Sequence, residues 1–162
     1  MKIRFFCCLA FCFCACIGAA EYPRKVSPYV IHDGDTFVIA QGNEVFRLWG
    51  IDAPESDQPW GDVAALALQT LIKKRMITLQ SVHGNTYGRD VVLATVRGKD
   101  IGLELLKMGL AWHDPRYAPD KKEYAEAMEE ARKAGRGLWS DKKPIAPWKW
   151  RAQRKYKIID EE

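Results

Sequence analysis

Cysteine is missing from most of this 162-residue chain, and its absence excludes two kinds of chemistry. The five cysteines all lie near the N-terminus, at Cys7, Cys8, Cys12, Cys14 and Cys16. If that segment is removed, the remaining protein has neither disulfide bonds nor thiol chemistry. Histidine is also scarce, with three widely spaced residues in the whole chain. Without cysteine or a histidine cluster, a zinc site is disfavoured.

The chain also lacks an apolar run long enough to span a membrane comfortably. Its main apolar run covers residues 5–17, follows two basic residues and ends in small residues at Ala20. This pattern predicts a secretory signal peptide over residues 1–20, and so a secreted or periplasmic protein with no membrane segment after cleavage. Two alternatives stay open, a lipid anchor on Cys16 and an uncleaved N-terminal anchor.

A marked excess of one charge sign is missing as well. The chain has 25 Lys and Arg residues against 21 Asp and Glu, a formal net charge of +4. Two of the basic residues belong to the predicted signal peptide, so the net charge after cleavage is too small to predict a polyanionic partner by itself. Basic residues do gather near the C-terminus, where a charged tail is most often simply solvated. They are Lys149, Arg151, Arg154, Lys155 and Lys157.

The rest of the sequence has no internal repeat and no sign of a second domain. We expect a signal peptide at 1–20, one globular domain at 21–141, and a tail rich in Trp and basic residues at 142–162. Alternating and β-branched segments predict five strands. They cover 26–31, 36–39, 45–49, 76–82 and 91–96. A loop with two glycines, 83–89, is expected between the last two strands.

Apolar residues at helical spacing predict three helices. They cover 63–74, 101–108 and a segment from about 120 to 135. Asp120 and Glu123 have the spacing of a capping box at the start of the third helix. Asp100 is expected to cap the second helix, and Gly109 to end it.

The order of these elements restricts the fold class. The first three strands follow one another without a helix between them, which disfavours βαβ units. The expected fold is α+β, a β-barrel with helices. Among such folds, a five-stranded OB-fold barrel with three helices is the simplest that accounts for the predicted elements.

The segment 32–55 concentrates charge at the ends of two apolar strands. A turn signal at 41–43 predicts an antiparallel hairpin between those strands. In that pairing Asp35 lies opposite Leu48 or its neighbour, at the distances of an antiparallel ladder. Arg47 is then close to Asp35.

The chain leaves this hairpin through Asp52 and Glu55 at the same end, so four charged groups are expected to share one small volume. Clustered carboxylates repel one another unless a cation compensates them, and their oxygens suit Ca²⁺ or Mg²⁺. Arg47 lies in an apolar strand and needs an anionic partner, either a carboxylate or a bound phosphate. A purely structural interpretation stays open, in which Asp35 belongs to a turn and Arg47 forms an ion pair.

Three motifs in this order and spacing carry a resemblance to a known family. They are Asp33-Gly34-Asp35-Thr36, then Phe46-Arg47-Leu48-Trp49-Gly50-Ile51-Asp52-Ala53-Pro54-Glu55, then Tyr87-Gly88-Arg89. From about Val26 to Trp139 the chain resembles the thermonuclease family, in its staphylococcal nuclease-like, secreted bacterial form. Two positions depart from the family pattern, Thr86 and Pro115, both at the base and sugar end of the family's pocket.

The resemblance implies an OB-fold nuclease that hydrolyses phosphodiester bonds in DNA and RNA, depends on Ca²⁺ and has little sugar specificity. The implied metal ligands are Asp35, Asp52 and, through its backbone carbonyl, Ala53. The implied catalytic residues are Glu55 as general base and Arg47 and Arg89 as phosphate ligands. Tyr87 and Tyr117 would line the nucleotide pocket. We expect a monomer whose partners are its DNA and RNA substrates, without a stable protein partner.

Two rival functions remain open on the sequence. One is a non-catalytic OB-fold module that binds single-stranded nucleic acid, and the other is a phosphodiesterase that acts on a small nucleotide. The tail has two possible roles as well. Trp148 and Trp150 could pack the tail over the barrel, or they could extend a nucleic-acid surface together with Arg151.

Overall fold

The computed structural model describes residues 22–27, 29–39 and 43–160. The predicted signal peptide, its cleavage after Ala20 and the alternative anchor at Cys16 lie outside these residues, as do Pro28 and most of the turn at 41–43. Within the described part of the chain, no helix has both the length and the apolar character needed to cross a membrane.

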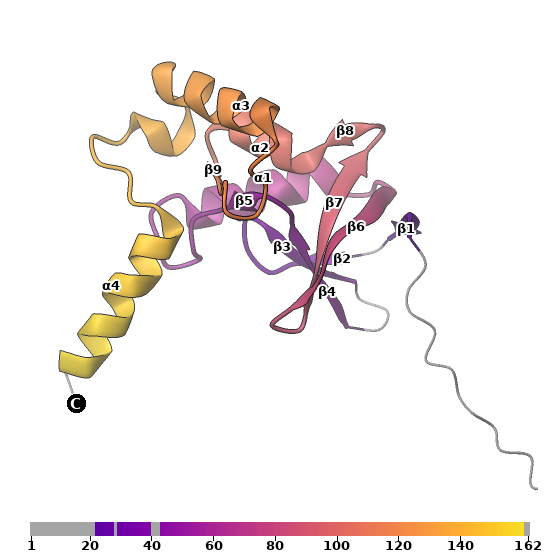
Figure 1. The fold of residues 1–162 in the computed structure, drawn as a ribbon, viewed down its shortest axis with the longest axis horizontal. Helices are drawn as coiled ribbons and strands as arrows, with labels where there is room; N and C mark the ends of the chain where they lie inside the picture. The colour runs from indigo at the N-terminus through magenta and orange to yellow at the C-terminus, as the bar shows by residue number, and fades with distance from the viewer. Residues whose placement is uncertain (1–21, 28, 40–42, 161–162) are drawn as a thin grey trace, which may run out of the picture.

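Nine strands form two sheets in the described part of the chain (Figure 1). They are β1 (Arg24–Val26), β2 (Tyr29–Ile31), β3 (Thr36–Ile39), β4 (Glu44–Leu48), β5 (Ile51–Asp52), β6 (Ile77–Thr86), β7 (Arg89–Val96), β8 (Lys99–Asp100) and β9 (Trp112–His113). The larger sheet has the order β1-β6-β7-β4-β3-β2, with β8 paired to β7, and β5 pairs with β9 in the smaller one. Strands β4 and β7 are parallel, and the other pairs are antiparallel.

The register of the β3–β4 hairpin confirms the sequence prediction. Thr36 pairs with Arg47, and Phe37 pairs with Phe46. One step further, the backbone N–H of Leu48 donates to the carbonyl of Asp35 at 2.8 Å. Asp35 therefore lies opposite Leu48, as the turn signal and the strand lengths predicted.

Two strand predictions were wrong in their limits. The single strand expected at 26–31 is two strands, because β1 pairs with β6 and β2 pairs with β3. The expected loop at 83–89 is mostly strand, since β6 extends to Thr86 and β7 begins at Arg89. Only Tyr87 and Gly88 form the turn, with φ of 54° and 76°, the left-handed pair that a tight two-residue hairpin requires.

Four α-helices and a 3₁₀ turn complete the described part. They are α1 (Gly61–Ile72), α2 (Ile101–Met108), α3 (Lys122–Lys133), η1 (Gly137–Ser140) and α4 (Pro147–Asp160). Asp100 caps α2 as predicted, since its carboxylate accepts from the N–H of Leu103 at 3.2 Å, and Gly109 ends the helix at φ 71°. The predicted cap at Asp120 was wrong, because α3 begins at Lys122 and no side chain caps it.

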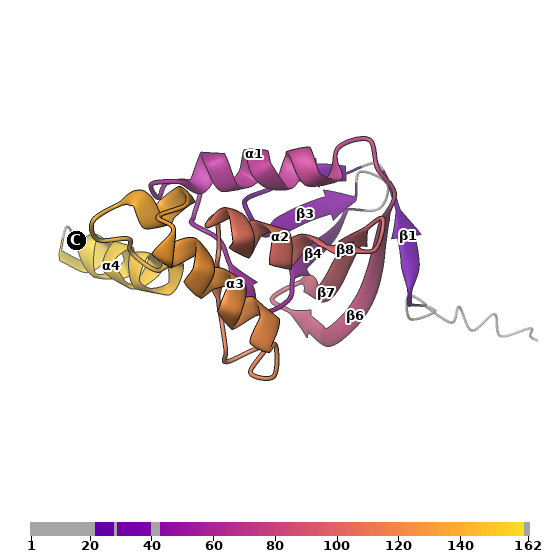
Figure 2. The ribbon, with the colours of Figure 1, turned by 90° about the horizontal axis from the view of Figure 1, so that it is seen from above.

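The core lies between the larger sheet and the helices (Figure 2). Phe37 and Phe46 stack on each other with ring centroids 5.6 Å apart, and Leu68 of α1 and Leu105 of α2 are fully buried in the same cluster. Burial of each such side chain stabilises the fold by roughly 1.5–3 kcal/mol. This core fixes the β3–β4 hairpin, and with it the charged residues at the end of the hairpin.

The observed architecture confirms the α+β class but not the detailed barrel. A meander, β2-β3-β4, joins a hairpin, β6-β7, through the parallel β4–β7 pair. Over the described residues, this path does not close into a barrel, and the counts differ from the predicted five strands and three helices. The main addition is α4, which occupies the tail predicted at 142–162 and lies at the end of the molecule opposite β1 (Figures 1 and 2).

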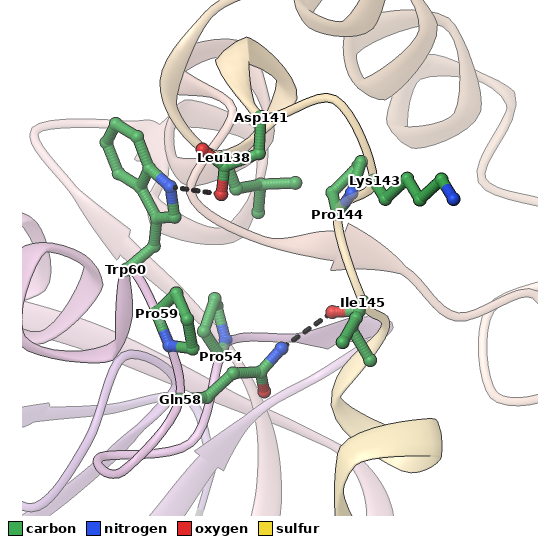
Figure 3. A pocket seen from close by; sticks show the side chains of 9 residues that line it. All are labelled: Pro54, Gln58, Pro59, Trp60, Leu138, Asp141, Lys143, Pro144 and Ile145. Carbon is green, nitrogen blue, oxygen red and sulfur yellow. Dashed lines mark hydrogen bonds between the residues drawn. The ribbon is translucent and has the colours of Figure 1, made fainter.

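Two hydrogen bonds hold the connector before α4 against the loop before α1 (Figure 3). The side-chain amide of Gln58 donates to the carbonyl of Ile145 at 2.6 Å, and the indole of Trp60 donates to Asp141 at 3.0 Å. Both donors lie just beyond Glu55 in sequence. The connector therefore places the start of α4 close to the charged cluster.

Candidate active site

A cavity of about 350 Å³ opens beside the end of the β3–β4 hairpin. It brings together six of the eight site residues that the sequence predicted. They are Arg47, Asp52, Glu55, Tyr87, Arg89 and Tyr117. The other two, Asp35 and Ala53, are buried beside Arg47 and Asp52 and are not among the lining residues.

Asp35 is 2% exposed, and three donors hold its carboxylate. Arg47 donates at 2.6 Å and the Thr36 hydroxyl at 2.9 Å to Oδ1, while the backbone N–H of Ala53 donates to Oδ2 at 2.8 Å. Burial raises the pKa of Asp35 to about 7, against the opposing effect of Arg47, and the nearby carboxylates of Asp33 and Asp52 add to the rise. The position therefore favours additional positive charge.

Asp33 forms the turn that leads into Asp35. Its carboxylate accepts from the backbone N–H of Asp35 at 3.0 Å, a local bond typical of Asp in turns. Asp33 also lines the cavity.

Arg47 links the two carboxylates that were predicted to bind metal. One terminal nitrogen is 2.6 Å from Asp35 Oδ1, and the other is 2.7 Å from Asp52 Oδ1. Burial would lower the pKa of Arg47, but both carboxylates outweigh that effect and raise it, so the guanidinium stays charged. The same side chain also reaches the cavity wall, where it is able to meet an anionic ligand.

Glu55 lies in the loop between β5 and α1. The backbone N–H of Glu55 donates to the Gln58 side chain at 3.2 Å, and a Cβ at Gly61 would overlap the Glu55 carbonyl. The loop therefore passes close to the first residue of α1, and this close packing fixes the backbone that carries the carboxylate.

Arg151, on α4, is a component of the site that the sequence reasoning did not place there. Its two terminal nitrogens lie 2.8 Å from Asp52 Oδ2 and 2.5 Å from Glu55 Oε1. A third contact joins it to Asp52 Oδ1 at 3.2 Å. These bonds, with the Asp52 bonds first, raise the pKa of Arg151 further. The only sequence signal was the group of Trp and basic residues in the tail, which left open whether the tail packs on the barrel or extends a nucleic-acid surface.

Aromatic and basic side chains form the outer wall of the cavity. Tyr117 is 58% exposed, and Arg116 lies over its ring at 5.8 Å and over the Trp148 ring at 5.5 Å. Tyr87, at the hairpin tip, is 93% exposed. Trp49 is half-buried, lines the cavity and donates to the carbonyl of Tyr117 at 2.9 Å.

Arg89 lies at the start of β7, on the cavity wall, and is half-buried. Among the described residues it forms no ion pair and no side-chain hydrogen bond. Its guanidinium is thus available to an anionic ligand without the loss of a bond to any described residue.

The chemistry of the donor set fits a hard divalent cation. In the described part of the chain, no three His, Cys, Asp or Glu side chains form a metal-binding group, but the predicted set needs only two carboxylates and a backbone carbonyl. Carboxylate and carbonyl oxygens are the ligands that Ca²⁺ prefers. The cluster of four carboxylates meets two guanidiniums, which leaves an excess of negative charge that a divalent ion would neutralise. The carboxylates are Asp33, Asp35, Asp52 and Glu55, and the guanidiniums are Arg47 and Arg151.

Comparison with known proteins gives consistent matches. The family model described as staphylococcal nuclease homologue matches residues 45–141. A Haemophilus influenzae protein named as an uncharacterized endonuclease is 36% identical over 128 residues, which cover 77% of this chain and 71% of that protein. An Escherichia coli protein with the same name is 32% identical over 127 residues, which cover 75% of this chain and 81% of that protein.

A plant relative extends the comparison to a longer protein. A staphylococcal-like nuclease of Arabidopsis thaliana is 35% identical over 133 residues, which cover 78% of this chain and 41% of that protein. The chain therefore spans about two-fifths of the plant relative's length. The family match ends at residue 141, before α4 begins at Pro147.

Proposed function

Since the chain belongs to the staphylococcal nuclease family, we propose that it is a calcium-dependent nuclease that hydrolyses phosphodiester bonds in DNA and RNA with little sugar specificity. One observation carries the proposal. A carboxylate and two arginines, Glu55, Arg47 and Arg89, share one open cavity with the buried Asp52 carboxylate. Phosphodiester hydrolysis needs a base near the attacking water and positive charge on the phosphate oxygens, and this set supplies both.

In this proposal, Glu55 accepts the proton of the attacking water. Arg47 and Arg89 bind the non-bridging oxygens of the scissile phosphate, for which the planar guanidinium fork is well suited. Asp35, Asp52 and the backbone carbonyl of Ala53 would hold Ca²⁺, which supplies electrostatic stabilisation of the charge that develops on the phosphate.

The outer wall of the cavity would bind the nucleotide. Tyr117 and Tyr87 are exposed and offer ring faces to a base, and stacking on such rings tolerates any base. A wall of this kind is consistent with little sugar or base specificity.

The deciding test is digestion of plasmid DNA and of RNA with Ca²⁺ and then with a chelator. We expect cleavage of both polymers only with Ca²⁺. Glu55→Gln should reduce the initial rate by about 10² to 10⁴, the usual contribution of a general base. An unchanged melting temperature of the variant would separate this loss from unfolding.

The same digest separates the rival functions. A gel shift without cleavage at any Ca²⁺ concentration would favour the non-catalytic module that binds single-stranded nucleic acid. Turnover of a nucleotide ester without turnover of polymer would favour the small-nucleotide phosphodiesterase.

We also propose that residues 1–20 direct secretion and that the processed chain acts as a monomer without a stable protein partner. The mass of the exported protein would distinguish cleavage after Ala20 from a lipid on Cys16. Light scattering would test the monomer.

A further inference from the structure

Helix α4 contacts the candidate site from outside the segment that the family match covers. Three of its side chains meet the body of the molecule besides Arg151. Trp148 packs edge-on against Trp112 at 5.6 Å, while Trp150 donates to Asp57 at 3.2 Å. Arg154 forms an ion pair with Asp57 at 2.9 Å. These contacts orient the helix so that Arg151 points into the cavity.

Arg151 uses the oxygens that a cation at Asp52 would need. Asp52 Oδ1 accepts from both Arg47 and Arg151, and Oδ2 accepts from Arg151 at 2.8 Å. A carboxylate oxygen has about two lone-pair sites, so Oδ1 has none left. Since the Asp52 side chain is only 3% exposed, a cation has little other approach to it.

Arg151 differs from Arg47 in its position and in its exposure to solvent. Arg47 already forms an ion pair with Asp35 and another with Asp52 from within the hairpin. Arg151 comes from a separate helix, and its side chain is 44% exposed. The Arg151 side chain is therefore closer to solvent than that of Arg47, which is 21% exposed.

We propose that Arg151 and the metal cation compete for Asp52, so that α4 sets the cation affinity of the site and cation binding releases the Arg151 anchor of α4. The inference rests on the proposed function, because it takes Asp52 as a cation ligand. Thermodynamic linkage makes the effect reciprocal. The docked α4 helix weakens cation binding by a certain free energy, and a bound cation weakens the docking of α4 by the same amount.

The first test is calorimetric titration of Ca²⁺ into the full-length protein and two variants. Arg151→Gln should bind Ca²⁺ about tenfold more tightly than the wild type, the factor expected if Arg151 holds Asp52 about 90% of the time. Arg154→Gln removes the same charge from the same helix but leaves the Asp52 contacts, so its affinity should stay within about twofold of the wild type. Arg151→Lys, which keeps the charge without the guanidinium fork, should fall between the wild type and Arg151→Gln.

The second test separates competition from a general charge effect. In the wild type, saturating Ca²⁺ should increase hydrogen exchange of the backbone amides in residues 148–155. In Arg151→Gln the same amides should already exchange faster, and Ca²⁺ should not change them further. A change in overall charge alone would not produce this pattern.

The outcomes are distinguishable from those of the proposed function. If Ca²⁺ binds with equal affinity to wild type and both glutamine variants, or if it leaves the exchange of α4 unchanged in the wild type, the competition is refuted and the nuclease proposal stands. If Ca²⁺ binds to none of the proteins, the proposed calcium dependence fails, and the competition fails with it.

Discussion

At the scale of single residues, Arg47 is the group on which the charged cluster depends most. It bridges Asp35 and Asp52, both nearly inaccessible to water, through contacts of 2.6 and 2.7 Å. Removing one partner from such a buried network leaves uncompensated charge, which costs more free energy than the intact pair contributes. Arg89 lies on the same cavity wall but forms no ion pair with a carboxylate among the described residues.

This contrast predicts different results for the two arginines. Arg47→Ala should lower the free energy of unfolding by about 3 kcal/mol, because Asp35 loses its only guanidinium partner among the described residues. Arg89→Ala should change it by less than about 0.5 kcal/mol. Both variants should lose about 10² to 10³ in cleavage rate. Urea denaturation and initial rates check this, and equal stability of the two variants would contradict the structural role of Arg47.

Asp114 gives a prediction for the acid range. Burial alone would raise the pKa of Asp114, but its hydrogen bonds with Arg116 outweigh that effect and leave the pKa below its ordinary value of 3.8. A carboxylate with a lowered folded-state pKa contributes stability above its ordinary pKa and loses it as the pH falls through the lowered value. The free energy of unfolding of the wild type should therefore exceed that of Asp114→Asn by about 1 kcal/mol at pH 6. The two values should converge near pH 2. Urea denaturation between these pH values measures the difference, and a constant gap would contradict the assignment.

At the scale of elements, the joint between α2 and η1 shows how tightly the backbone packs. Gly109 has a φ of 71°, and its carbonyl accepts from the N–H of Leu138 at 2.9 Å. A Cβ on Gly109 would overlap the carbonyl of Arg136. Both the backbone conformation and the close approach therefore require glycine here.

Gly135 provides a matched control for this joint, since its φ of 62° is similar but nothing lies within 4 Å of its added Cβ. Gly135→Ala should cost about 1 kcal/mol, from the left-handed conformation alone. Gly109→Ala should cost at least about 2 kcal/mol, because steric overlap adds to that strain. Thermal or urea unfolding compares them, and equal losses would mean that the joint relaxes freely.

Elements that carry local signals were predictable from the sequence. The Asp100 cap, the Gly109 stop and the β3–β4 register each depend on a few adjacent residues. The strand limits around Tyr87 were missed because cross-strand pairing, not composition, extends β6 and β7. The Asp120 cap failed because the N–H of Lys122 bonds to the Asp120 backbone carbonyl instead of its side chain.

Helix α4 was missed for a different reason. Its segment is polar and basic, which indicates a solvated tail, and its fixed position comes from contacts such as Arg151 with Asp52, 99 residues away along the chain. No local pattern encodes such a contact. The candidate site could therefore be predicted where its residues lie on the hairpin, but not where a distant helix completes it.

At the scale of the whole molecule, the site depends on segments that only the complete fold brings together. The hairpin, β5, β7 and α4 all contribute charged groups to one cavity. A cation bound there would stabilise the folded state as a whole, since the unfolded chain has no such site.

Calcium should therefore raise global stability by a defined amount. At a free concentration 100 times the dissociation constant, the free energy of unfolding should rise by about 2.7 kcal/mol. Asp52→Asn should abolish most of this rise, because it removes one carboxylate ligand. Urea denaturation with Ca²⁺ and with chelator measures the effect, and an equal response of both proteins would exclude Asp52 as a ligand.

The connector between η1 and α4 has a further consequence for proteolytic processing. Lys142 and Lys143 are exposed, and they precede the helix that carries Arg151. Cleavage of the peptide bond between them would end the covalent link of Arg151 to the nuclease domain and leave α4 held only by its non-covalent contacts. The effective concentration of Arg151 at Asp52 would then fall. Through the competition proposed above, a single cut there should raise the Ca²⁺ affinity of the site, and it would do so irreversibly.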